Sequence, residues 1–83
     1  MHRDIKLENI LIDNEGIIKI ADFGVSAEFD PKDPKKLRGK AGTVAYMSPE
    51  MINSSSKNKY SFSTDIWSAG VILYVMIHGH LPF

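Results

Sequence analysis

The stretch that decides the fold is His2-Arg3-Asp4-Ile5-Lys6-Leu7-Glu8-Asn9, which is followed further along the chain by Asp22-Phe23-Gly24. Together these two motifs supply the carboxylates of Asp4 and Asp22 and the carboxamide of Asn9. Carboxylate and amide oxygens are ligands that hard divalent cations such as Mg²⁺ accept in proteins. A functional site follows only if the fold brings these three side chains together.

The segment between the two motifs predicts how they meet. It contains two short β-branched runs, Ile10-Leu11-Ile12 and Ile17-Ile18-Lys19-Ile20, separated by the turn-forming cluster Asp13-Asn14-Glu15-Gly16. This pattern predicts a β-hairpin. Because a hairpin folds the chain back on itself, Asp22, just past the second strand, is expected to return beside Asn9, just before the first.

The following segment predicts a loop and a short helix. Residues 29–42 are polar and interrupted by proline and glycine, which predicts a long surface loop, and long loops in compact domains are usually functional. Ser48 is predicted to cap a short helix that begins at Pro49, where the fixed φ of proline suits the first helical position. Residues 53–62 are polar and predict a linker.

A longer helix is predicted near the end of the chain. Either Ser63 or Thr64 is expected to cap it, and it should run to about His78 and stop at Gly79. Residues 71–77 are apolar on nearly every face, which predicts a buried helix that other elements cover all round. A hairpin and one short helix are too little to cover it, which indicates that covering elements are missing.

Composition excludes several classes of function. The 83 residues amount to one small domain at most, and the ten basic and ten acidic side chains cancel, so no global field attracts nucleic acid or an anionic membrane. Without cysteine there is no disulfide, thiolate zinc site or thiol nucleophile. The N-terminus lacks the apolar run of a secretory signal. An intracellular, cytoplasmic protein is expected; the basic run within 32–40 also fits a nuclear localisation signal, although such runs are usually solvated faces.

Taken together, the motifs match a known set. Each alone is ordinary loop or turn sequence, but His2-Arg3-Asp4 with Asn9, then Asp22-Phe23-Gly24 and later Pro49-Glu50, form a combination that chance does not produce, with Ile5 in place of the usual Leu. The whole chain resembles the middle of the large lobe of a eukaryotic protein kinase of the serine/threonine type.

This resemblance implies an α+β fold that is a fragment of the kinase C-terminal lobe. Its parts would be the catalytic loop, the β-hairpin, the activation segment, a short helix and a long buried helix. Residues 1–83 would then be a partial catalytic domain, without the N-lobe and the distal C-lobe helices. Residues 20–26 and 65–71 look most similar to the upstream kinases of the calcium/calmodulin-dependent kinase kinase type.

The resemblance also implies roles for individual residues. Asp4 matches the catalytic Asp that accepts or orients the proton of the substrate hydroxyl, and Lys6 matches the Lys that steadies the γ-phosphate of ATP in serine/threonine kinases. Asn9 and Asp22 match the two Mg²⁺ ligands, which also makes them part of the nucleotide site. Thr43 resembles the threonine that positions the substrate by a hydrogen bond to the catalytic Asp.

Other matched residues imply structural support. His2 and Phe23 resemble stacked members of an internal spine, and Gly24 gives its loop backbone freedom. Asp65 resembles the helix carboxylate that accepts backbone N–H groups of the catalytic loop. Glu50 resembles the carboxylate that pairs with an Arg further downstream, which would lie beyond the last residue of this chain.

Arg3 also belongs to this supporting set, and it suggests a mode of regulation. In many kinases the Arg before the catalytic Asp binds a phosphate on the activation loop. Between Ser26 and Thr43 this sequence has no Ser, Thr or Tyr. The hypothesis is that phosphorylation in that stretch does not switch this protein on.

Two functions from different classes are compatible with the sequence. The first is a segment of an ATP- and Mg²⁺-dependent kinase that phosphorylates Ser or Thr of a protein substrate, with the missing N-lobe as its partner in the full-length protein and with no nucleic acid or membrane partner. The second is a truncated, non-catalytic or pseudokinase fragment that acts by binding. The chain lacks a glycine-rich loop, the strand Lys and the helix Glu of a kinase. The isolated chain is therefore expected to be inactive and to fold poorly on its own.

Overall fold

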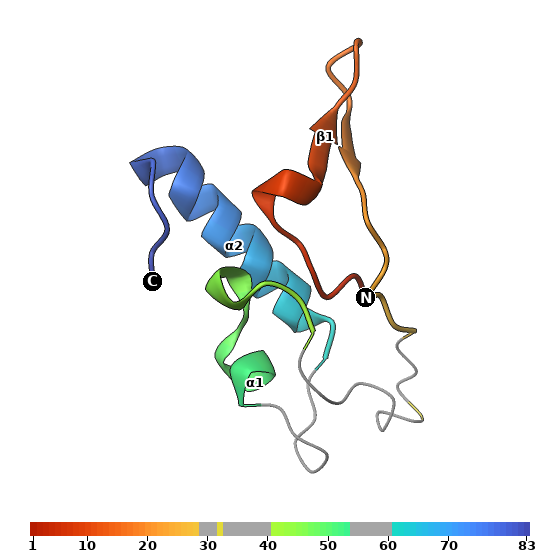
Figure 1. Cartoon of the computed structure of the whole chain (residues 1–83), viewed down its shortest axis with the longest axis vertical. Helices are drawn as coiled ribbons and strands as arrows, with labels where there is room; N and C mark the ends of the chain where they lie inside the picture. The colour runs from red at the N-terminus through yellow and green to blue at the C-terminus, as the bar shows by residue number, and fades with distance from the viewer. Residues whose placement is uncertain (29–31, 33–40, 54–60) are drawn as a thin grey trace.

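The computed structural model describes residues 1–28, 32, 41–53 and 61–83 (Figure 1). The elements are, in chain order, η1 (Leu7–Asn9), β1 (Ile10–Ile12), β2 (Ile18–Ile20), η3 (Val44–Tyr46), α1 (Pro49–Ile52) and α2 (Ser63–His78). Most of the predicted loop over 29–42, most of the basic run and most of the predicted linker over 53–62 lie outside the described residues. The described part is an α+β arrangement, with a two-stranded sheet on one side of α2 and α1 on the other.

The predicted hairpin is confirmed. Strands β1 and β2 are antiparallel, with Ile10 opposite Ile20 and Ile12 opposite Ile18. The turn closes through the N–H of Gly16, which donates to the carbonyl of Asp13 at 3.0 Å, and Gly16 has a positive φ of 79°. Glycine adopts that conformation without the steric cost that a Cβ brings.

The side chain of Asp13 organises the same turn. Its Oδ1 accepts the backbone N–H groups of Ile17 at 2.9 Å and of Glu15 at 2.8 Å. The pKa of Asp13 is lowered from its ordinary value, first by the hydrogen bond from Ile17 and further by that from Glu15 and by the ammonium of Lys19, 3.6 Å from Oδ2, because each favours the charged carboxylate. The turn is therefore held by a charged side chain at neutral pH.

The predicted start of α1 is also confirmed. Ser48 is the N-cap and its Oγ accepts the N–H of Met51 at 3.2 Å, with Pro49 at the first helical position. Ser48 is fully buried, and Met51 below it is 2 % exposed and is the centre of a small core cluster. Ser48 therefore caps the start of α1 and is itself packed in the interior of the molecule.

Replacing Ser48 by Ala is expected to lower the free energy of unfolding of the complete gene product by about 1 kcal/mol, because the amide of Met51 loses its side-chain acceptor and the buried hydroxyl of Thr64 loses its partner. Urea unfolding followed by circular dichroism measures the change. Ser63→Ala is the matched control: Ser63 is exposed, and its hydroxyl bonds to that of neighbouring Ser61 at 2.7 Å. Equal losses in the two variants would contradict the assignment of the cap.

The predicted cap of α2 is wrong. The helix begins at Ser63, but its N-cap is Phe62, and no side chain caps it. The hydroxyl of Thr64 is instead hydrogen-bonded to Ser48, and a local cap is lost to this long-range bond. The predicted stop is confirmed, since Gly79 has a φ of 76° and its N–H donates to the carbonyl of Val75 at 2.8 Å.

The prediction of a long buried helix is wrong for this chain. Within α2 only Thr64, Ser68 and Val71 are buried, whereas Ile66 and Met76 are 71 % and 70 % exposed. The physical reason is a shortage of covering elements, because the hairpin and α1 reach only part of the helix surface. The uncovered part lines an apolar groove of about 500 Å³ between the hairpin and α2. Within the described ranges, no helix combines the length and apolar character that a membrane span needs.

Candidate functional site

The opening segment of the chain is fixed to the first turn of α2. The carboxylate of Asp65 accepts two backbone N–H groups, that of His2 at 2.8 Å and that of Arg3 at 2.9 Å. Arg3 itself has a positive φ of 71°, which is uncommon for a residue with a side chain. The two charge-assisted bonds stabilise this backbone conformation. Asp65 therefore holds the loop that carries Asp4.

His2 joins the same loop to the chain after the hairpin. It is buried, its Nε2 donates to the carbonyl of Ala21 at 2.8 Å, and its Nδ1 accepts the N–H of Asp4 at 3.1 Å. Both bonds require the tautomer with the proton on Nε2, since a carbonyl only accepts and an N–H only donates. The ring also meets that of Phe23 edge to face, with centroids 4.8 Å apart. The two predicted spine residues are thus in contact, although Phe23 is 61 % exposed.

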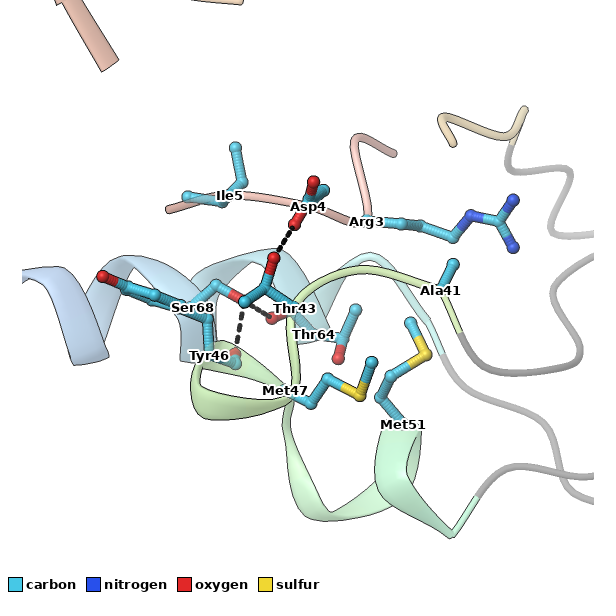
Figure 2. A pocket seen from close by; sticks show the side chains of 10 residues that line it. All are labelled: Arg3, Asp4, Ile5, Ala41, Thr43, Tyr46, Met47, Met51, Thr64 and Ser68. Carbon is cyan, nitrogen blue, oxygen red and sulfur yellow. Dashed lines mark hydrogen bonds between the residues drawn. The ribbon is translucent and has the colours of Figure 1, made fainter. Parts of the chain in front are cut away.

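Asp4, Lys6 and Thr43 form a closed polar triangle. The hydroxyl of Thr43 donates to Oδ1 of Asp4 at 2.9 Å and accepts from Nζ of Lys6 at 3.0 Å. The ammonium of Lys6 lies 3.7 Å from Oδ2 of Asp4. Figure 2 shows Asp4 and Thr43 facing each other from two separate segments. The triangle brings together residues 37 and 39 positions apart in the sequence.

Asn9 lies next to Asp4 and beside the chain that leads to Asp22. The residue is 7 % exposed, and its Nδ2 donates to the carbonyl of Asp4 at 2.9 Å. The carbonyl of Asn9 accepts the N–H of Ala21 at 2.8 Å, so the residue before Asp22 is bonded to Asn9 by the hairpin register. No donor among the described residues reaches Oδ1 of Asn9, which leaves a largely buried acceptor free.

Asp22 occupies a special backbone position. Its φ is 61°, and its Oδ1 accepts the N–H of Gly24 at 3.2 Å. A Cβ at Gly24 would lie 3.1 Å from that same Oδ1, so a larger residue there would press on the carboxylate. Asp22 is exposed. Just after it, the carbonyl of Val25 accepts Nε of Arg3 at 2.6 Å.

Gly42 occupies a position where the structure requires glycine, which the sequence did not reveal. Its φ is 100°, and a Cβ built on it would lie 2.2 Å from the backbone carbonyl oxygen of Arg3. The segment that carries Thr43 can approach the loop that carries Asp4 only because this side chain is absent. A small cavity of about 10 Å³ lies between the two segments and α2 (Figure 2). Only the neighbouring Thr43 hinted at this role, since the contact partner is distant in the sequence.

Glu50 is the predicted site residue that stays apart. It is exposed in the first turn of α1, and no cation of the described segments lies within ion-pair distance of it. The described residues also contain no cluster of three or more His, Cys, Asp or Glu side chains suited to a metal ion. A cation at this site would therefore depend on Asn9 and Asp22 together with ligands from a bound molecule.

Comparisons with known proteins identify the family of the chain. The family described as protein kinase domain matches residues 1–83. The chain is 47% identical over 83 residues to G protein-coupled receptor kinase 4 of Mus musculus, covering 100% of this chain and 14% of that protein. It is 48% identical over 84 residues to the calcium/calmodulin-dependent protein kinase kinase of Caenorhabditis elegans, covering 100% and 15%.

A plant relative gives the same result. CBL-interacting serine/threonine-protein kinase 15 of Arabidopsis thaliana is 49% identical over 84 residues, covering 99% of this chain and 19% of that protein. The chain thus spans less than a fifth of the length of these relatives. Because the identities are nearly equal, the similarity to the calcium/calmodulin-dependent kinase kinase type is no stronger than that to the others. The chain belongs to the eukaryotic protein kinase family.

Proposed function

We propose that this chain is the segment of a protein serine/threonine kinase that runs from the catalytic loop to the central helix of the C-terminal lobe, and that the whole protein transfers the γ-phosphate of ATP to Ser or Thr hydroxyls of proteins. The observation that carries the proposal is the triangle of Asp4, Lys6 and Thr43. It combines a carboxylate, a cation and a hydroxyl in one partly buried place.

The triangle suits the transfer of a phosphoryl group to an alcohol. A carboxylate such as that of Asp4 can orient an incoming hydroxyl and accept its proton. An ammonium such as that of Lys6, 25 % exposed, can balance negative charge on the phosphate. The hydroxyl of Thr43 bonds to both and fixes their mutual position. The resemblance of Lys6 and Thr43 to residues of serine/threonine kinases, and the similarity to a serine/threonine-protein kinase of Arabidopsis thaliana, favour Ser and Thr as acceptors.

The donor set next to the triangle fits Mg²⁺. Oδ1 of the buried residue Asn9 accepts from no donor among the described residues, and the exposed Asp22 directly follows Ala21, whose N–H donates to the carbonyl of Asn9. Mg²⁺ is usually bound through one or two carboxylates together with substrate phosphates, so a site with few protein ligands is the expected kind. Asn9 and Asp22 would hold the ions, which neutralise charge on the phosphates when bound.

We also propose that the 83 residues are part of a larger catalytic domain. The exposed apolar side chains of α2, among them Ile66 and Met76, support this, because such a surface is stable in water only when other elements cover it. The same surface favours a second candidate, a non-catalytic kinase fragment that acts by binding a partner there. In both cases the isolated chain would have negligible kinase activity.

Replacing Asp22 by Asn is expected to weaken the binding of Mg²⁺·ATP by about tenfold or more while leaving metal-free ATP binding nearly unchanged, because the lost charge acts on the cation. Titration of the complete gene product with a fluorescent ATP analogue, with Mg²⁺ and with EDTA, measures this difference. Asp13→Asn is the matched control, since Asp13 lies in the hairpin turn. Binding that is insensitive to Mg²⁺ in the unaltered protein would favour the second candidate.

A further inference from the structure

Three buried hydroxyl groups stand out in the small core. Ser48, Thr64 and Ser68 are 0 %, 3 % and 8 % exposed, whereas the buried apolar residues in the described part of the chain number only four: Ile5, Tyr46, Met51 and Val71. Burying a hydroxyl is unfavourable unless it is hydrogen-bonded. Because a hydrogen bond has a preferred geometry, these hydroxyls fix the relative orientation of the segments that they join. Their partners show which segments those are.

Each of these hydroxyls joins two segments of the chain or stabilises the end of a helix. Thr64 bonds to Ser48, which links α2 to the start of α1. Ser68 donates to the backbone carbonyl of Tyr46 at 2.8 Å, and its Oγ lies 3.2 Å from the carbonyl of Thr64 in its own helix. A carbonyl can only accept, so the direction of the bond from Ser68 to Tyr46 is fixed. Figure 2 shows Ser68 between Thr64 and Tyr46.

The carbonyl of Tyr46 belongs to the short turn that presents Thr43. The N–H of Tyr46 donates to the carbonyl of Thr43 at 2.9 Å, and Thr43 is the residue that precedes η3. Both polar groups of the Tyr46 backbone are thus bonded, one to Thr43 and the other to Ser68. The orientation of η3 relative to α2 then depends on the hydroxyl of Ser68.

The same helix holds the other side of the triangle. Asp65 fixes the backbone of the loop that carries Asp4, and Ser68 follows three residues later on the same face of α2. Two residues on one face of α2, Asp65 and Ser68, therefore position the segments that carry Asp4 and Thr43. A change at Ser68 would move Thr43 and leave the loop of Asp4 in place.

We propose that Ser68 is a positioning residue for phosphoryl transfer: its hydrogen bond to the carbonyl of Tyr46 sets η3 so that the hydroxyl of Thr43 reaches Asp4. This inference rests on the proposed function and adds to it a residue that touches neither substrate nor nucleotide. Small misplacements of groups that orient a reactant reduce turnover strongly.

The kinetic test is a double-mutant cycle in the complete gene product. Ser68→Ala is expected to lower kcat for a Ser peptide about tenfold, with the affinity for Mg²⁺·ATP unchanged. In a Thr43→Val background, which lacks the hydroxyl to be positioned, the same change should cost less than about twofold. Ser63→Ala, the same substitution at the exposed start of α2, should have no effect. Equal losses in both backgrounds would mean a merely structural role and overturn the proposal.

Amide hydrogen exchange tests the positioning role of Ser68 without a measurement of activity. In the Ser68→Ala protein, amide hydrogen exchange at Tyr46 is expected to become about tenfold faster, because η3 loses its anchor on α2, while His2 and Arg3 keep their protection from Asp65. Unchanged exchange at Tyr46 overturns the proposal whatever the activity. If the unaltered protein transfers no phosphate, the proposed function fails, and exchange at Tyr46 still tests the positioning.

Discussion

Replacing Asp4 by Asn is expected to reduce kcat for peptide phosphorylation by about 10³-fold, the range that removal of a general base produces. The carboxamide has nearly the shape of the carboxylate and its oxygen can still accept the hydroxyl of Thr43, which now bonds to Oδ1 of Asp4 at 2.9 Å. What is lost is the negative charge and the ability to take a proton. The affinity for Mg²⁺·ATP should change little, because Asn9 and Asp22 keep their positions.

Steady-state kinetics of the complete gene product, with the concentration of folded protein measured by nucleotide binding, provides the test. Asp13→Asn is the matched control: it makes the same chemical change at a carboxylate in the turn of the hairpin, where it bonds to Ile17 and Glu15. That variant should keep its kcat. An Asp4→Asn protein with more than about a tenth of the original kcat would show that Asp4 is not the base.

Replacing Gly42 by Ala is expected to lower kcat about 100-fold, because a displacement of roughly an ångström at a positioning group has an effect of that size. The new Cβ would lie 2.2 Å from the carbonyl oxygen of Arg3, at a φ of 100°. That oxygen belongs to the backbone, and the N–H of Arg3 is bonded to Asp65. Neither segment can yield like a flexible side chain, so Thr43 and Asp4 must separate.

Gly16→Ala is the matched control for this prediction. Gly16 also has a positive φ, 79°, but a Cβ there would meet nothing within 4 Å. Gly16→Ala introduces the strain of a Cβ at a positive φ, about 1 kcal/mol, without a collision with another segment. It should lower thermal stability and leave kcat unchanged. If Gly42→Ala retained kcat as well, the close approach of the two segments would not matter for catalysis.

Local signals explain the parts of the fold that the sequence predicted correctly. The turn cluster between two β-branched runs predicted the hairpin, Ser48 before Pro49 predicted the start of α1, and Gly79 predicted the end of α2. Each of these depends on residues that are close together in the chain. The hairpin in turn explains why Asn9 and Ala21 are bonded, and thus why Asp22 returns to this end of the molecule.

The wrong cap and the unforeseen roles of Gly42 and Ser68 come from contacts between distant residues, whereas the error about the burial of α2 comes from the shortage of covering elements. Ser63 and Thr64 have the side chains of caps, but Thr64 bonds to Ser48, which is 16 positions away. The steric need for Gly42 depends on Arg3, and the partner of Ser68 is 22 positions away. For the site, the spacing of Asp4, Lys6 and Asn9 identified the chemistry through resemblance alone, whereas the bonds that orient Thr43 became visible only in the structure.

The most direct test is the transfer of labelled γ-phosphate by the complete gene product to peptides that are identical except for Ser, Thr, Tyr or Ala at the acceptor position. We predict Mg²⁺-dependent labelling of the Ser and Thr peptides and none of the Tyr and Ala peptides, with the label lost in the Asp4→Asn protein. A folded protein that binds Mg²⁺·ATP and labels neither the Ser nor the Thr peptide, or that labels the Tyr peptide equally well, would contradict the account.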